Sequence, residues 1–478
     1  MFLKKAILTG KIILLLIIGI ETNAQVKPWT LKECIDTAIV KNILLNQTQL
    51  TSKLNEINYD QAKANRYPDF SVTDGQSFNF GNSVNLYNDQ STRQNISSNN
   101  VALNGNITLY NGYQLKNTIK QSKYIYDAGN FDVEKIKNDI TLDVVADFFQ
   151  VLYSYKALEI ARNQLSGTLT QVERTQKFVD AGKLAEGNLL QIQSQLATDK
   201  ASVVSTENQL QLAKVTLMQL MNMPVIDNFE VDSISTKEPS FVNINSTADI
   251  YKTSEGIMPE IKSAELKTKA DETEIKIAQA ISLPKLSLGG SLKTAYSSGS
   301  NLFSTTTTYQ QEDIGYLQSN PADQVLGLIP VTVTQKQNYP FSSQFKDNFS
   351  QGISLSLTIP VFTNYQAKYG IAKAKINLQN SQLIEQSVRD QLRKLIEQAY
   401  TDLIAAVKDY SAAQEILKSE QRSYSDLEKK YNLGLSTATD FLIEKNNYVK
   451  AQLSVIQSKF SYIFKSKIVD FYLGKPLN

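Results

Sequence analysis

Residues 67–72 read Tyr-Pro-Asp-Phe-Ser-Val, and residues 283–288 read Leu-Pro-Lys-Leu-Ser-Leu. In both stretches a proline stands between a pattern of helical spacing and an alternation of apolar and polar residues. Proline is excluded from helix interiors, and period-two alternation indicates a β-strand. Each stretch therefore predicts a turn from a helix into a strand, and its occurrence twice indicates an internal repeat.

The repeat extends over the rest of the chain. A shift of 216 positions superposes Pro68 on Pro284, and a shift of 252 superposes Gly182 on Gly434 without a gap. The difference of 36 residues is one insertion between the paired strands of the second copy. The chain is therefore a tandem duplication of about 220 residues.

Four segments carry apolar residues at every second position, with Ser, Thr, Asn, Lys and Gly between them. We expect strands at about 68–80, 100–110, 284–296 and 350–361. About 9–11 residues cross a membrane as a tilted strand of a β-barrel. The alternative reading is a small half-buried sheet of a soluble protein.

Long helices are expected in the two proline-free stretches, 69–223 and 361–475, where apolar residues recur at steps of three and four. A helix over about 112–180 would be roughly 100 Å long. Shorter helices are expected at 31–66, 188–222, about 247–282 and about 438–473. We expect the short helices to stack in pairs beside one long helix in each repeat, giving four helical columns per chain.

The composition argues against an enzyme. The 478 residues include no histidine and a single cysteine, Cys34. Histidine is the commonest general acid or base, and a disulfide, a Cys-rich zinc site or an iron–sulfur cluster needs several cysteines. We therefore expect no catalytic site, no cofactor and no metal. With 49 basic and 47 acidic residues and no basic cluster, we expect no nucleic-acid partner.

The N-terminus is typical of a signal peptide. Lys4, Lys5 and Lys11 precede a nine-residue apolar run, and small residues follow at the expected cleavage site after Ala24. We expect 1–24 to be removed, which leaves 46 basic and 46 acidic side chains. The first repeat then covers 25–240 and the second covers 241–478.

Several motifs together resemble the TolC family of outer-membrane efflux channels over nearly the whole mature chain. The opening segment Trp29-Thr-Leu-Lys-Glu-Cys-Ile-Asp-Thr-Ala, the two quoted proline turns and Ile359-Pro-Val-Phe-Thr-Asn are similar to segments of that family. The most specific motif is Tyr431-Asn-Leu-Gly-Leu-Ser-Thr-Ala-Thr-Asp-Phe-Leu, which resembles the hairpin tip at the periplasmic end of the tunnel. Its first-repeat counterpart is Phe178-Val-Asp-Ala-Gly-Lys-Leu-Ala-Glu-Gly-Asn-Leu-Leu.

The resemblance implies a mainly α-helical chain with a membrane β portion. Three copies would form an α-helical barrel in the periplasm, continuous with a 12-stranded β-barrel in the outer membrane to which each chain gives four strands. Physics alone requires several copies, because four strands cannot close and open edges are not tolerated in lipid. It does not exclude four chains with sixteen strands.

The implied function is a passive conduit of a tripartite efflux or type I secretion system. Its partners would be outer-membrane lipid, a periplasmic adaptor and an inner-membrane pump. The alternative is an exported coiled-coil tether or adhesin without a pore. No residue selects among drugs, metal ions, peptides and proteins as cargo.

The resemblance also assigns residues to the two hairpin tips. Docking of the adaptor is expected at Gly182, Leu184, Leu433, Gly434 and Leu435. A glycine alone could simply end its helix, since it tolerates a positive φ. The first tip also departs from the family pattern, with Lys183 where a leucine is usual.

Asp440 matches the aspartate constriction of the family at the periplasmic entrance. The corresponding residue of the first repeat is Asn188, and Ile443 stands where a second acidic ring can occur. Tyr431 and Glu444 are further candidates for hydrogen bonds that hold the tip closed. The alternative for Asp440 is a favourable place in the first turn of a helix, without a gating role.

The 36-residue insertion enlarges the connection over 297–348, which we expect to be a long loop. Such a loop either lies in water at the surface or folds over the mouth and narrows the exit. The sequence leaves both alternatives open.

Overall fold

The computed structural model describes residues 27–84, 91–93, 95–232, 246–475 and 477. The expected signal peptide lies outside the described residues. The boundaries expected for the two repeats stay a prediction.

The chain folds into two compact units, each of which takes segments from both repeats. The helical unit comprises Met1–Glu56, Tyr124–Lys269 and Gln379–Asn478. The sheet unit comprises Ile57–Lys123 and Ala270–Leu378.

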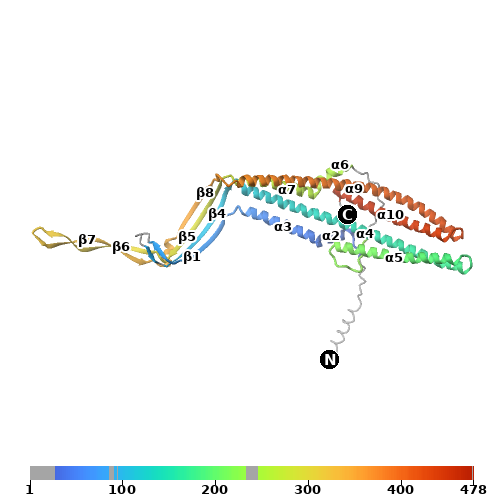
Figure 1. Ribbon diagram of the computed structural model, residues 1–478, viewed down its shortest axis with the longest axis horizontal. Helices are drawn as coiled ribbons and strands as arrows, with labels where there is room; N and C mark the ends of the chain where they lie inside the picture. Colours follow the sequence, from blue (N-terminus) through green and yellow to red (C-terminus); the bar gives the residue numbers. More distant parts are fainter. Residues whose placement is uncertain (1–26, 85–90, 94, 233–245, 476, 478) are drawn as a thin grey trace, which may run out of the picture. The chain divides into compact units, whose positions relative to one another are not determined.

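Four long helices repeat in length and spacing (Figure 1). They are α4 (Gln114–Asp180), α5 (Glu186–Leu220), α9 (Gln366–Asn432) and α10 (Ala438–Tyr472). The first of each pair has 67 residues and the second has 35, and every bound of the second pair lies 252 positions after its counterpart. The expected duplication and long helices are thereby confirmed.

The helices expected over 31–66 and 247–282 were predicted wrongly as single elements. Each is two helices: α2 (Leu31–Lys41) with α3 (Ile43–Ala64), and α6 (Thr247–Ile257) with α7 (Pro259–Ala280). Met258 has ψ of 127° because the residue before a proline is sterically excluded from the helical region. Asn42 has a similar ψ of 124°, and its side-chain Oδ1 accepts a hydrogen bond from the Leu45 amide at 3.0 Å, which caps α3.

An arginine forms ion pairs on both sides of the break between α6 and α7. From α9, Arg389 pairs with Glu255 of α6 at 2.5 Å and with Glu265 of α7 at 2.6 Å. It also pairs with Glu385 on its own helix at 3.0 Å. One guanidinium presents several donors in a rigid plane and can therefore hold two helix segments at once.

The helical unit has two cores, each built mainly by one repeat. In the first repeat, Val144 and Phe148 of α4 are buried with Cys34 of α2 and Met218 of α5. The second has an equivalent core, made by Leu392, Ile396 and Leu403 of α9, Ile250 of α6, Ile261 of α7 and Tyr462 of α10. Phe471 packs against both cores and joins them.

The sheet unit contains a four-stranded antiparallel sheet in the order β1-β4-β5-β8. Its strands are β1 (Asp69–Asn79), β4 (Ile96–Asn111), β5 (Lys285–Ser297) and β8 (Ser350–Thr358). The four expected strands are therefore confirmed. The centre of the sheet is the pair β4–β5, which joins one repeat to the other, while β1 and β8 form its two edges.

The register gives this sheet one apolar and one polar face. Val72, Leu103, Leu292 and Gln351 follow one another across the four strands on one face. Phe70, Ile107, Leu288, Leu355 and Leu357 lie on the same face. The opposite face carries small and polar residues, namely Ser71, Thr73, Asn104, Asn106, Ser287, Ser291, Ser354 and Ser356. A strand between lipid and a watery lumen needs this division.

The insertion is not the long loop that the sequence predicted. It forms an antiparallel hairpin, β6 (Asn301–Leu317) with β7 (Asn320–Asn338), followed by the short helix α8 (Phe341–Asp347). β6 carries the threonine run 305–308 and β7 carries the run Val331-Thr-Val-Thr, and these β-branched residues favour extended backbone. Gln344 of α8 is buried and bonds the backbone amide and carbonyl of Ser297 at 2.9 and 3.0 Å, which fastens the base of the hairpin to β5.

A smaller hairpin, β2 (Asn82–Val84) with β3 (Ser91–Arg93), comes between β1 and β4 in the sequence. None of the described helices is both long enough and apolar enough to cross a bilayer.

Candidate functional site

The two helical hairpins of the helical unit turn by the same backbone motif. Gly182 and Gly434 have φ of 65° and 76°, and each follows the last residues of a 67-residue helix. The amide of Lys183 donates to the Phe178 carbonyl at 2.8 Å, and the amide of Leu435 donates to the Lys430 carbonyl at the same distance. This six-to-one bond is the Schellman ending of a helix, which places glycine in the left-handed region.

The exposed side chains of the two tips differ. Leu433 and Leu435 flank Gly434 and are 74% and 73% exposed. In the first tip, Leu184 is half-buried, whereas Gly182 and Lys183 are exposed. Only the second of these two tips therefore presents a pair of exposed leucines.

Asp440 lies in the first turn of α10, with its side chain exposed. The Thr437 hydroxyl accepts a hydrogen bond from the Asp440 amide at 3.1 Å and donates to Asp440 Oδ2 at 2.6 Å. This geometry is that of a helix N-cap. Asn188, the counterpart in α5, is half-buried, and the cap residue Ala185 provides no side-chain bond. Ile443 is exposed.

Tyr431 is buried inside the second hairpin. Its ring stacks on Phe441 of α10, with centroids 4.8 Å apart and planes 11° apart. Phe441 also contacts Tyr424, which stacks on Tyr448 at 5.1 Å. Ile192 of α5 packs into the same cluster and brings the first hairpin against the second. No hydrogen-bond partner of the Tyr431 hydroxyl was found among the described residues.

The sequence analysis missed three members of this aromatic column, Tyr424, Phe441 and Tyr448. A signal was present, because Tyr424 precedes Tyr431 by seven residues and Phe441 precedes Tyr448 by seven. Residues seven apart lie on the same face of a helix.

Glu444 faces a second carboxyl group, that of Glu420 on α9. Partial burial and a hydrogen bond with the Glu444 carboxyl raise the pKa of Glu420 above its ordinary value. The other oxygen of Glu444, Oε1, is buried, and no partner of it was found in the described part of the chain. Two carboxyl groups can share a hydrogen bond only while one of them holds a proton.

A buried charged network that the sequence did not reveal lies beside the aromatic column. Lys445 of α10 is 5% exposed, and its ammonium donates to Thr168 Oγ1 of α4 at 2.5 Å. The Thr168 hydroxyl in turn donates to the buried carboxylate of Asp199 on α5. Burial lowers the pKa of Lys445, against the attraction of Asp199. The network thus links α10 of the second repeat to both helices of the first hairpin.

Among the residues that the structure describes, no group of three or more His, Cys, Asp or Glu side chains is arranged to hold a metal ion. The absence of a cofactor or metal stays a prediction.

The comparisons with known proteins agree on one family. A family model described as outer membrane efflux protein matches residues 34–223 and 254–466, one stretch in each repeat. The two stretches together cover more than half of the chain.

Individual relatives are distant. Toxin and drug export protein A of Aggregatibacter actinomycetemcomitans is 21% identical over 368 residues, which is 76% of this chain and 69% of that protein. Outer membrane protein TolC of Salmonella enteritidis is 21% identical over 337 residues, 70% of this chain and 61% of that protein. A solved structure of CusC superposes with a TM-score of 0.74 at 17% identity, over 93% of this chain and 92% of that one, which shows a shared fold.

We expect Lys445→Met to destabilise the helical unit by about 3 kcal/mol, because removing one partner leaves the buried charge of the other uncompensated. The measurement is the loss of helical circular dichroism in urea, in detergent. Lys450→Met, at an exposed position of the same helix, is the control and should have almost no effect. The double change Lys445→Met with Asp199→Leu should recover most of the loss. Equal midpoints for wild type and Lys445→Met would contradict the assignment.

We expect the stability of the second hairpin to fall as the pH rises above 4.5, the ordinary pKa of a glutamic acid. The raised pKa of Glu420 means that the folded state holds the shared proton more firmly than the unfolded state. The resulting stabilisation is full below the ordinary pKa and is lost as the pH rises through the folded one. Glu444→Gln supplies an amide donor that needs no proton and should flatten the profile. Exposed Glu415→Gln should not, and parallel profiles for all three proteins would refute the pairing.

Proposed function

This chain belongs to the outer membrane efflux protein family, and we propose that three copies of it form a passive conduit across the periplasm and the outer membrane. A periplasmic adaptor and an inner-membrane pump would supply the docking contacts and the energy. Membership of a family of outer-membrane efflux channels favours this function over a coiled-coil tether without a pore. It also makes the chain a member of a channel family, not of an enzyme family.

The observation that carries the proposal is the four-stranded sheet with one apolar and one polar face. Its edges, β1 and β8, expose backbone groups that lipid cannot satisfy. Pairing β8 of one copy with β1 of the next closes the sheet, and three copies give twelve strands. An eight-stranded barrel is filled by its own side chains, so twelve strands leave room for a bore lined by the Ser and Asn face.

Adaptor docking at the second tip is supported by the exposed apolar pair around Gly434. Gly182 and Leu184 belong to a tip with an exposed Lys183, which makes that tip less suited to an apolar contact. The second tip is therefore the primary docking element in our proposal, and the first tip is secondary.

A gate role for Asp440 is compatible with its place in the first turn of α10, where Thr437 is the cap. Thr437 donates to Oδ2 of this carboxylate, which is exposed. In a trimer three such carboxylates would surround one axis, and rings of acidic side chains attract cations in pores. Tyr431 would stabilise the closed tip by packing, since its ring is buried against Phe441.

We expect Gly434→Glu to abolish export while the trimer still assembles, because a charge is placed between Leu433 and Leu435. Export of a fluorescent dye from cells measures function, and heat-modifiable migration on an SDS gel measures assembly. Gly434→Asn tolerates the positive φ without a charge and is the control; it should retain export. Gly182→Glu should have a smaller effect. Normal export by Gly434→Glu would exclude docking at this tip. If the wild-type protein showed no SDS-resistant species on the gel, a closed barrel would be excluded.

We expect Asp440→Asn to lower both the cation preference and the block by multivalent cations. The asparagine oxygen can still accept from Thr437, so the cap is kept while the charge is removed. Planar-bilayer recording of wild type and variant measures both quantities. Asp409→Asn, at an exposed position on α9, is the control and should behave like wild type. Identical selectivity and block in all three proteins would leave Asp440 with only its structural role, as the first-turn partner of the Thr437 cap.

A further inference from the structure

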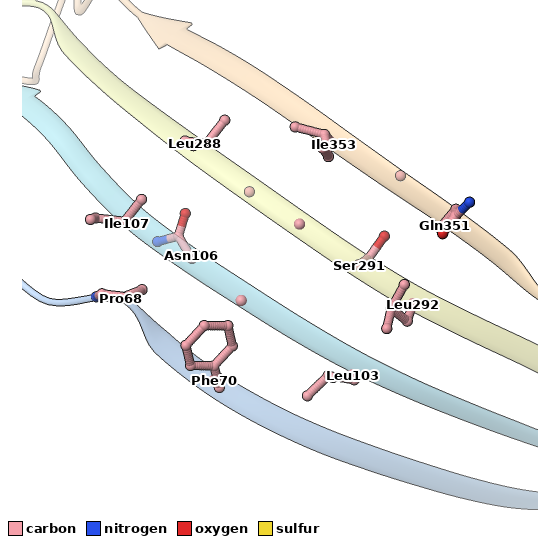
Figure 2. A pocket seen from close by; sticks show the side chains of 14 residues that line it. Pro68, Phe70, Leu103, Asn106, Ile107, Leu288, Ser291, Leu292, Gln351 and Ile353 are labelled. Carbon is pink, nitrogen blue, oxygen red and sulfur yellow. The ribbon is translucent and has the colours of Figure 1, made fainter.

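A hollow of about 870 Å³ lies on the apolar face of the four-stranded sheet. Its floor is two glycines, Gly105 of β4 and Gly290 of β5, which are direct partners in the register. Figure 2 shows the four strands and the side chains that surround this floor.

The register makes a rim of apolar side chains around the glycine pair. Across the sheet, Phe70 of β1 is the partner of Gly105, and Ile353 of β8 is the partner of Gly290. On either side along the strands, Leu103 pairs with Leu292 and Ile107 pairs with Leu288. Two positions without a side chain are thus enclosed on all four sides by large apolar residues.

The two halves of the floor differ in how open they are. A Cβ added to Gly105 would lie 2.6 Å from Cε1 of Phe70, so the phenyl ring covers this glycine. A Cβ added to Gly290 would meet no atom within 4 Å. The hollow over Gly290 is therefore open to an external group, and its apolar rim offers water little to bond to.

Cationic and aromatic side chains stand where the strands meet the helices within the same unit. Tyr113 and Tyr365 occupy equivalent places in the two repeats, and Lys116 and Lys368 lie over their rings at 5.9 and 5.6 Å. Tyr and Lys at this level are typical of the boundary between hydrocarbon and water, where phosphate headgroups lie. Pro68, at the turn into β1, lines the hollow at the end nearest to this boundary.

We propose that the hollow binds one acyl chain of a membrane phospholipid, whose phosphate lies beside Lys116 or Lys368. This inference rests on the proposed function, which places the apolar face against lipid. A chain in the hollow is contacted on several sides. Because hydrocarbon surrounds the chain in either case, its gain comes from closer van der Waals contacts with the rim and not from leaving water. A neighbouring copy would pair with the edges β1 and β8 and would not cover this face.

The direct test is the binding of dioleoylphosphatidylethanolamine to delipidated protein in detergent, followed by native mass spectrometry. Gly290→Leu fills the open half of the floor and should weaken binding at least tenfold. Gly75→Leu is the matched control, because Gly75 lies in β1 on the polar face and also has no atom within 4 Å of an added Cβ. It should bind like wild type. Equal affinity for Gly290→Leu and wild type overturns the proposal.

The headgroup is tested with the double variant Lys116→Gln and Lys368→Gln. It should weaken binding of the phospholipid severalfold and leave binding of dioleoylglycerol, which has no phosphate, unchanged. Equal loss for both lipids would refute the phosphate contact.

A tryptophan reporter tests the position of the chain without filling the hollow. With substoichiometric phosphatidylethanolamine brominated on its acyl chains, Ile353→Trp at the rim should be quenched and Ser354→Trp on the polar face should not. Equal quenching of the two would overturn the proposal. Heat-modifiable migration and conductance are recorded for every variant. A variant that loses lipid binding but keeps wild-type migration and conductance shows that the hollow acts separately from the channel function. A wild-type protein that shows neither heat-modifiable migration nor conductance would refute the channel itself.

Discussion

The ladder of backbone hydrogen bonds between β4 and β5 is the interaction on which the rest of the molecule depends. It joins strands about 190 residues apart and turns two hairpins, each too small to be stable alone, into one four-stranded sheet. The same ladder fixes which side chains share a face, since a slip of one residue would exchange the apolar and polar faces. It does not close the sheet, and the open edges β1 and β8 are the physical reason that one chain cannot be the complete channel.

Much of the fold could be predicted from periodicity, because a chain duplicated with so few prolines shows its elements twice. The four strands and the two 67-residue helices agree with the sequence patterns to within a few residues. The break at Asn42 has no proline to announce it and depends on one side-chain cap, so it was missed. The hairpin β6–β7 was missed because its Thr and Gln residues give no clear alternation of polarity. The site was predicted less well, since whether a lysine such as Lys445 is exposed or buried depends on helices far apart in the sequence.

The two hairpin tips share a backbone turn but differ in their side chains. Both tips have a glycine with a similar positive φ, so the two turns have the same backbone geometry. The second tip adds a capped helix start at Thr437 and an aromatic column through Phe441, whereas the first has an uncapped Ala185. The first hairpin instead contacts the second, through the side chain of Ile192 and through the hydrogen-bonded pair Thr168 and Asp199. The second hairpin has a pair of exposed leucines at its tip, and Ile192 of the first hairpin packs against its aromatic column.

Glycine has different uses in the helical unit and in the sheet unit. At the tips, Gly182 and Gly434 have open space around them, so the backbone angle alone requires glycine. In the sheet, no positive φ is involved at Gly105 or Gly290, and what matters is the missing side chain. A β-sheet surface that only had to face lipid would be filled by Leu, Ile or Phe at these positions, as it is at every neighbouring position of the rim. A pair of glycines facing each other in register costs backbone entropy and packing area, and the hollow they create is the feature that compensates for this cost once a lipid chain occupies it.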